Sequence, residues 1–103
     1  MYLRTMYLYN VTIIAENDVS DAVIKHLRAE LFGEQNPNLS LSLLQLLDSP
    51  HEGATYCIQL RCQDSTDITA FQANNLTILQ TGLNELYPGK VVFFASTMKY
   101  LND

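Results

Sequence analysis

The spacing of apolar residues alternates along this chain between the period of a β-strand and the period of an α-helix. Residues 7–15 (YLYNVTIIA) alternate between two faces, one of them strongly apolar, as a strand does. From Val19 to Leu31 the apolar positions recur at helical spacing, and Gly33 and then Pro37 are expected to end that helix. The chain is therefore predicted to begin with a strand followed by a helix.

The rest of the chain repeats this pattern with an additional hairpin. Leucines alternate with serines from Leu39, and their phase slips at Leu44, which predicts a bent edge strand with a bulge. A turn sequence rich in Ser, Pro and Gly leads into a second strand at 54–62, so these two strands should form a hairpin. Residues 65–87 place apolar side chains on one helical face, and a final strand is predicted within 90–101.

The order β-α-β-β-α-β predicts an α+β fold, the ferredoxin-like plait. Right-handed crossovers would place both helices on one face of a four-stranded antiparallel sheet and leave the other face uncovered. A chain of 103 residues is enough for one such domain with its own core.

Charge and motif content exclude several classes of function. The net charge is −5 and the six Lys and Arg residues are scattered, which argues against binding to nucleic acid. The acidic residues have a structural explanation, because Asp21 and Asp67 lie where helices should begin and would favour the positive end of each helix dipole. Cys57 and Cys62 do not have the spacing of a metal or redox pair, and we predict neither a metal nor a cofactor.

The first sixteen residues, MYLRTMYLYNVTIIAE, are predicted to contain a strand and no targeting signal. Asn10 and Thr12 interrupt the apolar run, and Ala15 is followed by Glu16 and Asn17 where a cleavage site would need small residues. No stretch approaches the roughly 20 apolar residues of a membrane-spanning helix. Two thiols that cannot reach each other suggest a reducing compartment, so we expect a cytoplasmic protein without membrane contact.

The uncovered face of the predicted sheet mixes polar and apolar side chains. It should carry Asn10, Thr12, Ile14, Cys57, Gln59 and Arg61, with either Phe94 and Met98 or Phe93 and Thr97 from the last strand. Such a face is unusual in contact with water, and association with a second copy would cover it. We therefore predict a homodimer whose contacts include Asn10, Thr12, Gln59 and Arg61.

The second helix offers another candidate contact surface. Between Asp67 and Lys90 the only charged residue is Glu85. Two interpretations remain open: the outer face of this helix is neutral but solvated, or another subunit packs against it.

Two sets of polar residues are candidates for a site. Gln72 and Asn75 fall within the apolar arc of the second helix, and Tyr9 and Tyr56 are predicted to face the same space between helices and sheet, where a polar-edged pocket would suit a small organic ligand. The alternative is that these groups only satisfy one another's hydrogen bonds.

His26 and Glu30 form the second set. They lie four residues apart on the first helix, which is the minimum arrangement for an oriented acid or base, although a solvated surface pair would look the same.

Three stretches carry a resemblance to a known family: MYLYNVTI at 6–13, EGATYCIQL at 52–60 and YPGKVVFFASTMKYL at 87–101. Together they resemble a family of short bacterial proteins known only as a domain of unknown function, number 4286 in its series. Chains of that family begin at the equivalent of Met6, which implies an N-terminal extension at 1–5 and a single ferredoxin-like domain at 6–103. The segment ELFGEQNP at 30–37 departs from the family pattern.

The resemblance also implies a fold similar to dimeric α+β barrel proteins, which include cofactor-free monooxygenases and small isomerases. It brings no established catalytic residue, and a fold alone does not transfer a reaction.

Three hypotheses for function follow. The first is a non-enzymatic homodimer that binds a small molecule or a protein partner, and we favour it because the sequence contains no catalytic motif. The second is a cofactor-independent enzyme, monooxygenase-like or isomerase-like, which would use Tyr9, Tyr56, Gln72, Asn75 or His26. The third is a purely structural module, which differs from the first only in lacking a pocket.

Overall fold

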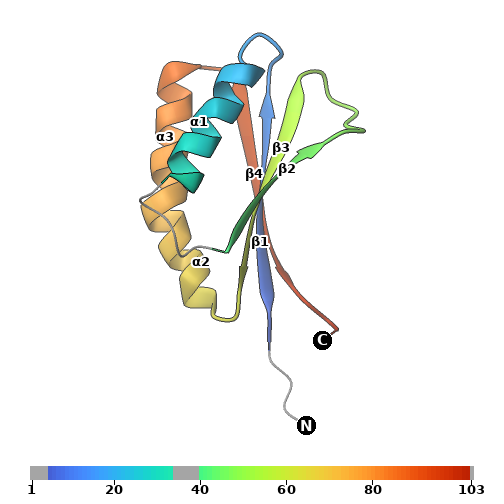
Figure 1. Cartoon of the computed structure of the whole chain (residues 1–103), viewed down its shortest axis with the longest axis vertical. Coiled ribbons are helices and arrows are strands. Elements are labelled where there is room, and N and C mark those ends of the chain that lie inside the picture. Colours follow the sequence, from blue (N-terminus) through green and yellow to red (C-terminus); the bar gives the residue numbers. More distant parts are fainter. Residues whose placement is uncertain (1–4, 34–39, 103) are drawn as a thin grey trace.

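The computed structural model describes residues 5–33 and 40–102 of the chain. Strands and helices follow the predicted order (Figure 1). The elements are β1 (Tyr7–Ala15), α1 (Ser20–Phe32), β2 (Leu41–Leu46), β3 (Ala54–Cys62), α2 (Ser65–Phe71), a π-helical turn η1 (Gln72–Leu76), α3 (Thr77–Leu86) and β4 (Val91–Lys99).

The four strands form one antiparallel sheet in the order β2-β3-β1-β4. β1 lies in the centre, paired along its whole length with β3 on one side and β4 on the other. All helices cover the same face of the sheet, and the opposite face is left open (Figure 1). The α+β plait predicted from the sequence is confirmed.

The core lies between the helices and the inner face of the sheet. Every second residue of β1 from Tyr9 to Ala15 is buried there, which is the reason its period of two was readable in the sequence. The helices contribute Val23, Leu27 and Leu31 from α1, and Phe71 and Leu79 among others from the second helical segment. Burying a side chain of this size contributes about 1.5–3 kcal/mol.

The predicted bulge in β2 is wrong. Its residues pair one to one with β3, from Leu41 opposite Leu60 to Leu46 opposite Thr55. Leu44 and Leu46 lie on the open face, where they are about half exposed, so leucines on both faces of one regular strand produced the apparent change of phase. Leu39 and Pro37 lie outside the described residues.

The predicted second helix consists of two α-helical segments joined by η1. At this turn the N–H of Thr77 donates to the carbonyl oxygen of Gln72, five residues earlier, and the Thr77 hydroxyl donates to the same oxygen at 2.8 Å. Leu86 was expected on the buried face but is 57% exposed. None of the helices in residues 5–33 and 40–102 is long and apolar enough to cross a membrane.

Asp64 begins α2 by capping it. Its side chain accepts a hydrogen bond of 2.9 Å from the N–H of Thr66, and this bond lowers the pKa of the Asp64 carboxyl below its ordinary value. A carboxylate with a lowered pKa in the folded state contributes stability above its unfolded pKa and loses that contribution as the pH falls through the folded value.

We therefore expect Asp64→Ala to lower the midpoint of thermal unfolding at pH 7 and to lose this effect near pH 2. Circular dichroism melts at both pH values measure the difference. Asp64→Asn is the control, because an amide oxygen still caps the helix and should keep most of the midpoint at both pH values. A deficit of equal size at pH 7 and near pH 2 in Asp64→Ala would contradict the capping role.

Candidate functional site

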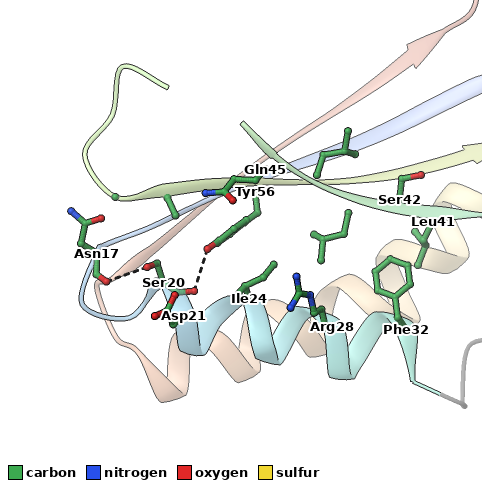
Figure 2. Close-up of a pocket in the computed structure, with 14 residues that line it drawn as sticks. Asn17, Ser20, Asp21, Ile24, Arg28, Phe32, Leu41, Ser42, Gln45 and Tyr56 are labelled. Carbon is green, nitrogen blue, oxygen red and sulfur yellow. Dashed lines mark hydrogen bonds between the residues drawn. The ribbon is translucent and has the colours of Figure 1, made fainter. Parts of the chain in front are cut away.

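A groove of about 880 Å³ separates α1 from the edge strand β2 (Figure 2). β2 is the outermost strand of the sheet on this side. The lining residues come from α1 and its preceding turn, from β2, and from the start of β3. They are Asn17, Ser20, Asp21, Ile24, Arg28, Phe32, Leu41, Ser42, Leu43, Leu44, Gln45, Gly53, Ala54 and Tyr56.

One stripe of α1 forms the helical wall of the groove. Ser20, Ile24, Arg28 and Phe32 recur at every fourth position, which places their side chains on one face of the helix. Figure 2 shows Ile24, Arg28 and Phe32 extending from α1 toward the strands, with Ser20 and Asp21 at one end of the groove and Phe32 at the other. Along this wall the polar end is thus followed by apolar Ile24, cationic Arg28 and apolar Phe32.

Tyr56 extends from β3 across the polar end of the groove. Its ring is 5% exposed, and its hydroxyl donates to the carbonyl oxygen of Ser20 at 3.3 Å. Burial raises the pKa of Tyr56, the Asp21 carboxylate raises it further, and the Arg28 guanidinium acts in the opposite direction. Charges of both signs therefore act on this hydroxyl.

The charged residues that line the groove are Asp21 and Arg28. Within the described residues the ion pairs are those of Lys90 with Glu16 and with Asp18, at 3.3 Å and 3.0 Å. Neither Arg28 nor Asp21 takes part in them. Among the same residues, no group of three or more His, Cys, Asp or Glu side chains is arranged to hold a metal ion.

Tyr9 and Gln72 are in contact at a place apart from the groove. Tyr9 is buried between helices and sheet, whereas Gln72, predicted within the apolar arc of its helix, is exposed. The Gln72 amide nitrogen donates to the Tyr9 hydroxyl at 3.2 Å, and the Tyr9 ring meets Phe71 edge-on with centroids 6.1 Å apart. Asn75 is half-buried in the same helical turn as Gln72. Of the four predicted ligand-binding residues, the structure brings Tyr9 and Gln72 into contact and places Tyr56 in the groove; their role toward a ligand stays a prediction.

His26 and Glu30 lie on α1 outside the groove. His26 is half-buried and faces α3, where a Cβ added to Gly82 would lie 3.4 Å from its Nε2 atom. Glu30 is exposed. Their role as an acid–base pair also stays a prediction.

The open face of the sheet has a polar centre. The Gln59 amide donates to Asn10 Oδ1 at 3.3 Å, and the Asn10 amide donates to Thr12 Oγ1 at 3.0 Å. Arg61 lies over the ring of Tyr100, with its Cζ atom 5.5 Å from the centroid. All four predicted dimer-face residues are thus on this face, and three of them form one hydrogen-bonded row.

Apolar side chains flank this row on both sides. The register of β4 places Phe94 opposite Thr12 and Met98 opposite Leu8, which settles the two alternatives left open for the last strand. These open-face apolar residues are 45–57% exposed: Leu44, Leu46, Val92, Phe94 and Met98.

Sequence reasoning missed the groove and its residues Asp21, Arg28 and Phe32. A signal for its helical wall was present, since Ser20, Ile24, Arg28 and Phe32 repeat every four residues on the edge of the buried stripe. No pattern in the sequence indicated the position of β2 relative to α1, because that position depends on tertiary packing.

Comparison with known proteins identifies relatives of the sequence and of the fold. A family model described as "Domain of unknown function (DUF4286)" matches residues 6–101, which confirms the resemblance carried by the strands. No curated protein matches the sequence.

Among solved structures, a de novo designed protein, Foldit4, is similar with a TM-score of 0.58 and 12% identity, over 91% of this chain and 96% of its own. CPII from Thiomonas intermedia K12, bound to ADP, AMP and acetate, has a TM-score of 0.50 and 11% identity, over 97% and 94%. A putative PII-like signaling protein from Thermus thermophilus has a TM-score of 0.45 and 17% identity, over 95% and 92%. At these identities the likeness concerns the fold alone.

Proposed function

The chain belongs to the DUF4286 family, and we propose that it is a homodimeric binding module without catalytic activity, formed by residues 6–103 as one domain. In this proposal two copies stack the open faces of their sheets, and each copy leaves its groove free on the helix side. The observation that carries the proposal is the set of half-exposed apolar side chains that flank the polar row on the open face, including Phe94 and Met98. Apolar patches of this kind on a monomer mark interaction surfaces.

Charge favours a second copy as the occupant of this face. A molecule with a net charge of −5 repels its own copies, and this repulsion is weakest for a contact surface that lacks carboxylates. Among the open-face positions of the four described strands, Arg61 is the charged residue, and the others are apolar or neutral. Two acidic molecules can therefore approach through this face at little electrostatic cost.

The size of the face is also adequate. β1, β3 and β4 have nine residues each and β2 has six. With strands about 4.8 Å apart and ~3.3 Å per residue, the face has an area of about 520 Å². Stacking two such faces with their projecting side chains would bury more than about 1,000 Å² in total, the size expected of a specific interface. The hydrogen-bonded row of Asn10, Thr12 and Gln59 would lie at its centre, where each of these side chains already makes a hydrogen bond within the row.

The enzymatic hypothesis has less support. It requires reactive polar groups gathered at one accessible site. Tyr9 is 3% exposed and bonded to Gln72, His26 faces α3, and Tyr56 lies in the groove without either of them. We therefore place the binding function first.

The oligomeric state tests this proposal. We expect the parent chain to have the mass of two copies in light scattering at micromolar concentration. The double variant Phe94→Glu/Met98→Glu should have the mass of one copy, with dimer affinity at least 100-fold weaker, because carboxylates would be buried without partners. Both side chains are about half exposed, so the isolated subunit should keep its fold.

Ile78→Glu is the control, since Ile78 is 60% exposed on α3 and lies outside the open face. It should remain dimeric. A monomeric parent chain would refute the homodimer, and dissociation by Ile78→Glu but not by the double variant would place the contact on the helices instead.

A further inference from the structure

The helical wall of the groove carries two opposite charges separated by an apolar side chain. Asp21, Ile24 and Arg28 all line the groove from α1. Asp21 and Arg28 are seven residues apart, which is about two turns or roughly 10.5 Å along the helix axis. At that separation they are not i, i+3 or i, i+4 neighbours and do not pair with each other along the helix.

The opposite wall is polar at the end that Asp21 occupies and mainly apolar along the rest. Gln45 pairs with Tyr56 in the β2–β3 register, so an amide and a hydroxyl lie together at the end of the groove that Asp21 occupies. Leu43 follows, and Leu41 lies beside Phe32 at the other end (Figure 2). The groove is therefore polar and negative at one end, apolar in its middle and positive toward the other end.

The Tyr56 ring is held in place at the negative end. Its hydroxyl is already bonded to the Ser20 carbonyl, and the side chain is buried, so the ring forms a fixed wall. Fixed walls reduce the ordering cost of binding a flexible ligand.

We propose that this groove binds a small linear zwitterion, whose carboxylate pairs with Arg28, whose ammonium pairs with Asp21, and whose apolar middle lies against Ile24. This inference rests on the proposed binding function and names its ligand class. A groove of about 880 Å³ lies within the range of sites for small organic molecules. Arg is suited to the carboxylate because its planar guanidinium binds two oxygens at once.

Isothermal titration calorimetry with three probes tests the order of charges. The probes are 8-aminooctanoate, octanoate and octylamine, which share an apolar chain and differ in their charged ends. We expect 8-aminooctanoate to bind about tenfold more tightly than octanoate or octylamine, because it forms both charge-assisted contacts. Equal affinity of octylamine and 8-aminooctanoate, or the absence of heat with all three at millimolar concentration, would overturn the proposal.

Two pairs of variants locate the binding. Arg28→Gln should weaken 8-aminooctanoate and octanoate about tenfold and leave octylamine unchanged. Lys99→Gln removes the same charge from an exposed position on β4, at the edge of the sheet opposite β2 and outside the groove, and should change none of them. Asp21→Asn should weaken 8-aminooctanoate and octylamine only, whereas the distant control Glu85→Gln should have no effect.

A loss of binding in Lys99→Gln as large as in Arg28→Gln would show general charge attraction and refute the site. The oligomeric state of the same samples separates this inference from the dimer. Arg28→Gln should bind poorly yet keep the mass of two copies, so the groove and the dimer can fail independently.

Discussion

Replacement of Gly53 by alanine is expected to lower the free energy of unfolding by roughly 3 kcal/mol. Gly53 has φ = +92°, a conformation that costs an L-residue about 1–2 kcal/mol. A Cβ at this position would also lie 2.2 Å from the carbonyl oxygen of Ala15, at the end of the central strand β1. Because that atom belongs to the backbone, relief of the overlap must move β1 or the start of β3.

Urea unfolding at 25 °C measures this cost, and Gly89→Ala separates its two components. Gly89 also has a positive φ, +74°, but a Cβ there meets nothing within 4 Å. Gly89→Ala should therefore lose only the conformational part, about 1 kcal/mol. Equal losses in the two variants would show that the contact with Ala15 relaxes without cost.

Gly53 also lines the groove, so a substitution that destabilises the sheet at this position should change the shape of the groove as well. Residual folded Gly53→Ala protein should have a displaced β2–β3 hairpin, since Gly53 lies between these strands. The turn was predictable from its Ser, Pro and Gly content, but the need for glycine at this one position was not. It arises from the approach of Ala15, a residue distant in sequence.

The central elements of the fold were predictable because each buries one face at a regular period. β1 matches its predicted limits of 7–15, and α1 ends directly before Gly33 as expected. β2 was harder to read, because an edge strand beside an apolar open face carries leucine on both sides. Apolar periodicity reports burial, and it misleads where apolar side chains serve an exposed surface.

The candidate site was predictable only where it lies within one element. The helical position of Gln72 predicted a contact with the sheet, and its amide does bond the Tyr9 hydroxyl although the residue itself is exposed. The groove instead requires the distance between α1 and β2, which are joined through residues outside the described part of the chain. Arg28 therefore looked like any exposed helical arginine until β2 was in place.

The π-helical turn η1 did leave a signal in the sequence. The buried positions of the second helical segment are Ile68, Phe71, Leu76, Leu79 and Leu83, with a gap of five between Phe71 and Leu76. In a continuous α-helix five residues rotate about 140° past a full turn, which would turn Leu76 away from the face of Phe71. The π turn accommodates the extra residue, so that both side chains stay in the core.

Deletion of Ala73 should therefore be tolerated. Ala73 is exposed within η1, and its removal reduces the gap between Phe71 and Leu76 to four residues, which suits a regular α-helix. We expect the free energy of unfolding in urea to stay within about 1 kcal/mol of the parent, because the buried set keeps its face without the π turn.

Deletion of Thr81 is the matched control with the opposite expected outcome. Thr81 is also exposed, but it lies in the regular helix α3, where no extra residue can be removed. Its deletion rotates all following residues of the helix by about 100° relative to those before it. Leu83 then leaves the buried face that Leu76 and Leu79 share, and the turn into β4 is displaced with it. The expected loss is at least about 3 kcal/mol, the cost of displacing a buried leucine. Equal losses of stability in the two deletions would contradict the view that η1 only absorbs one extra residue. In that case η1 would be needed for a specific contact, such as the hydrogen bond from Gln72 to Tyr9.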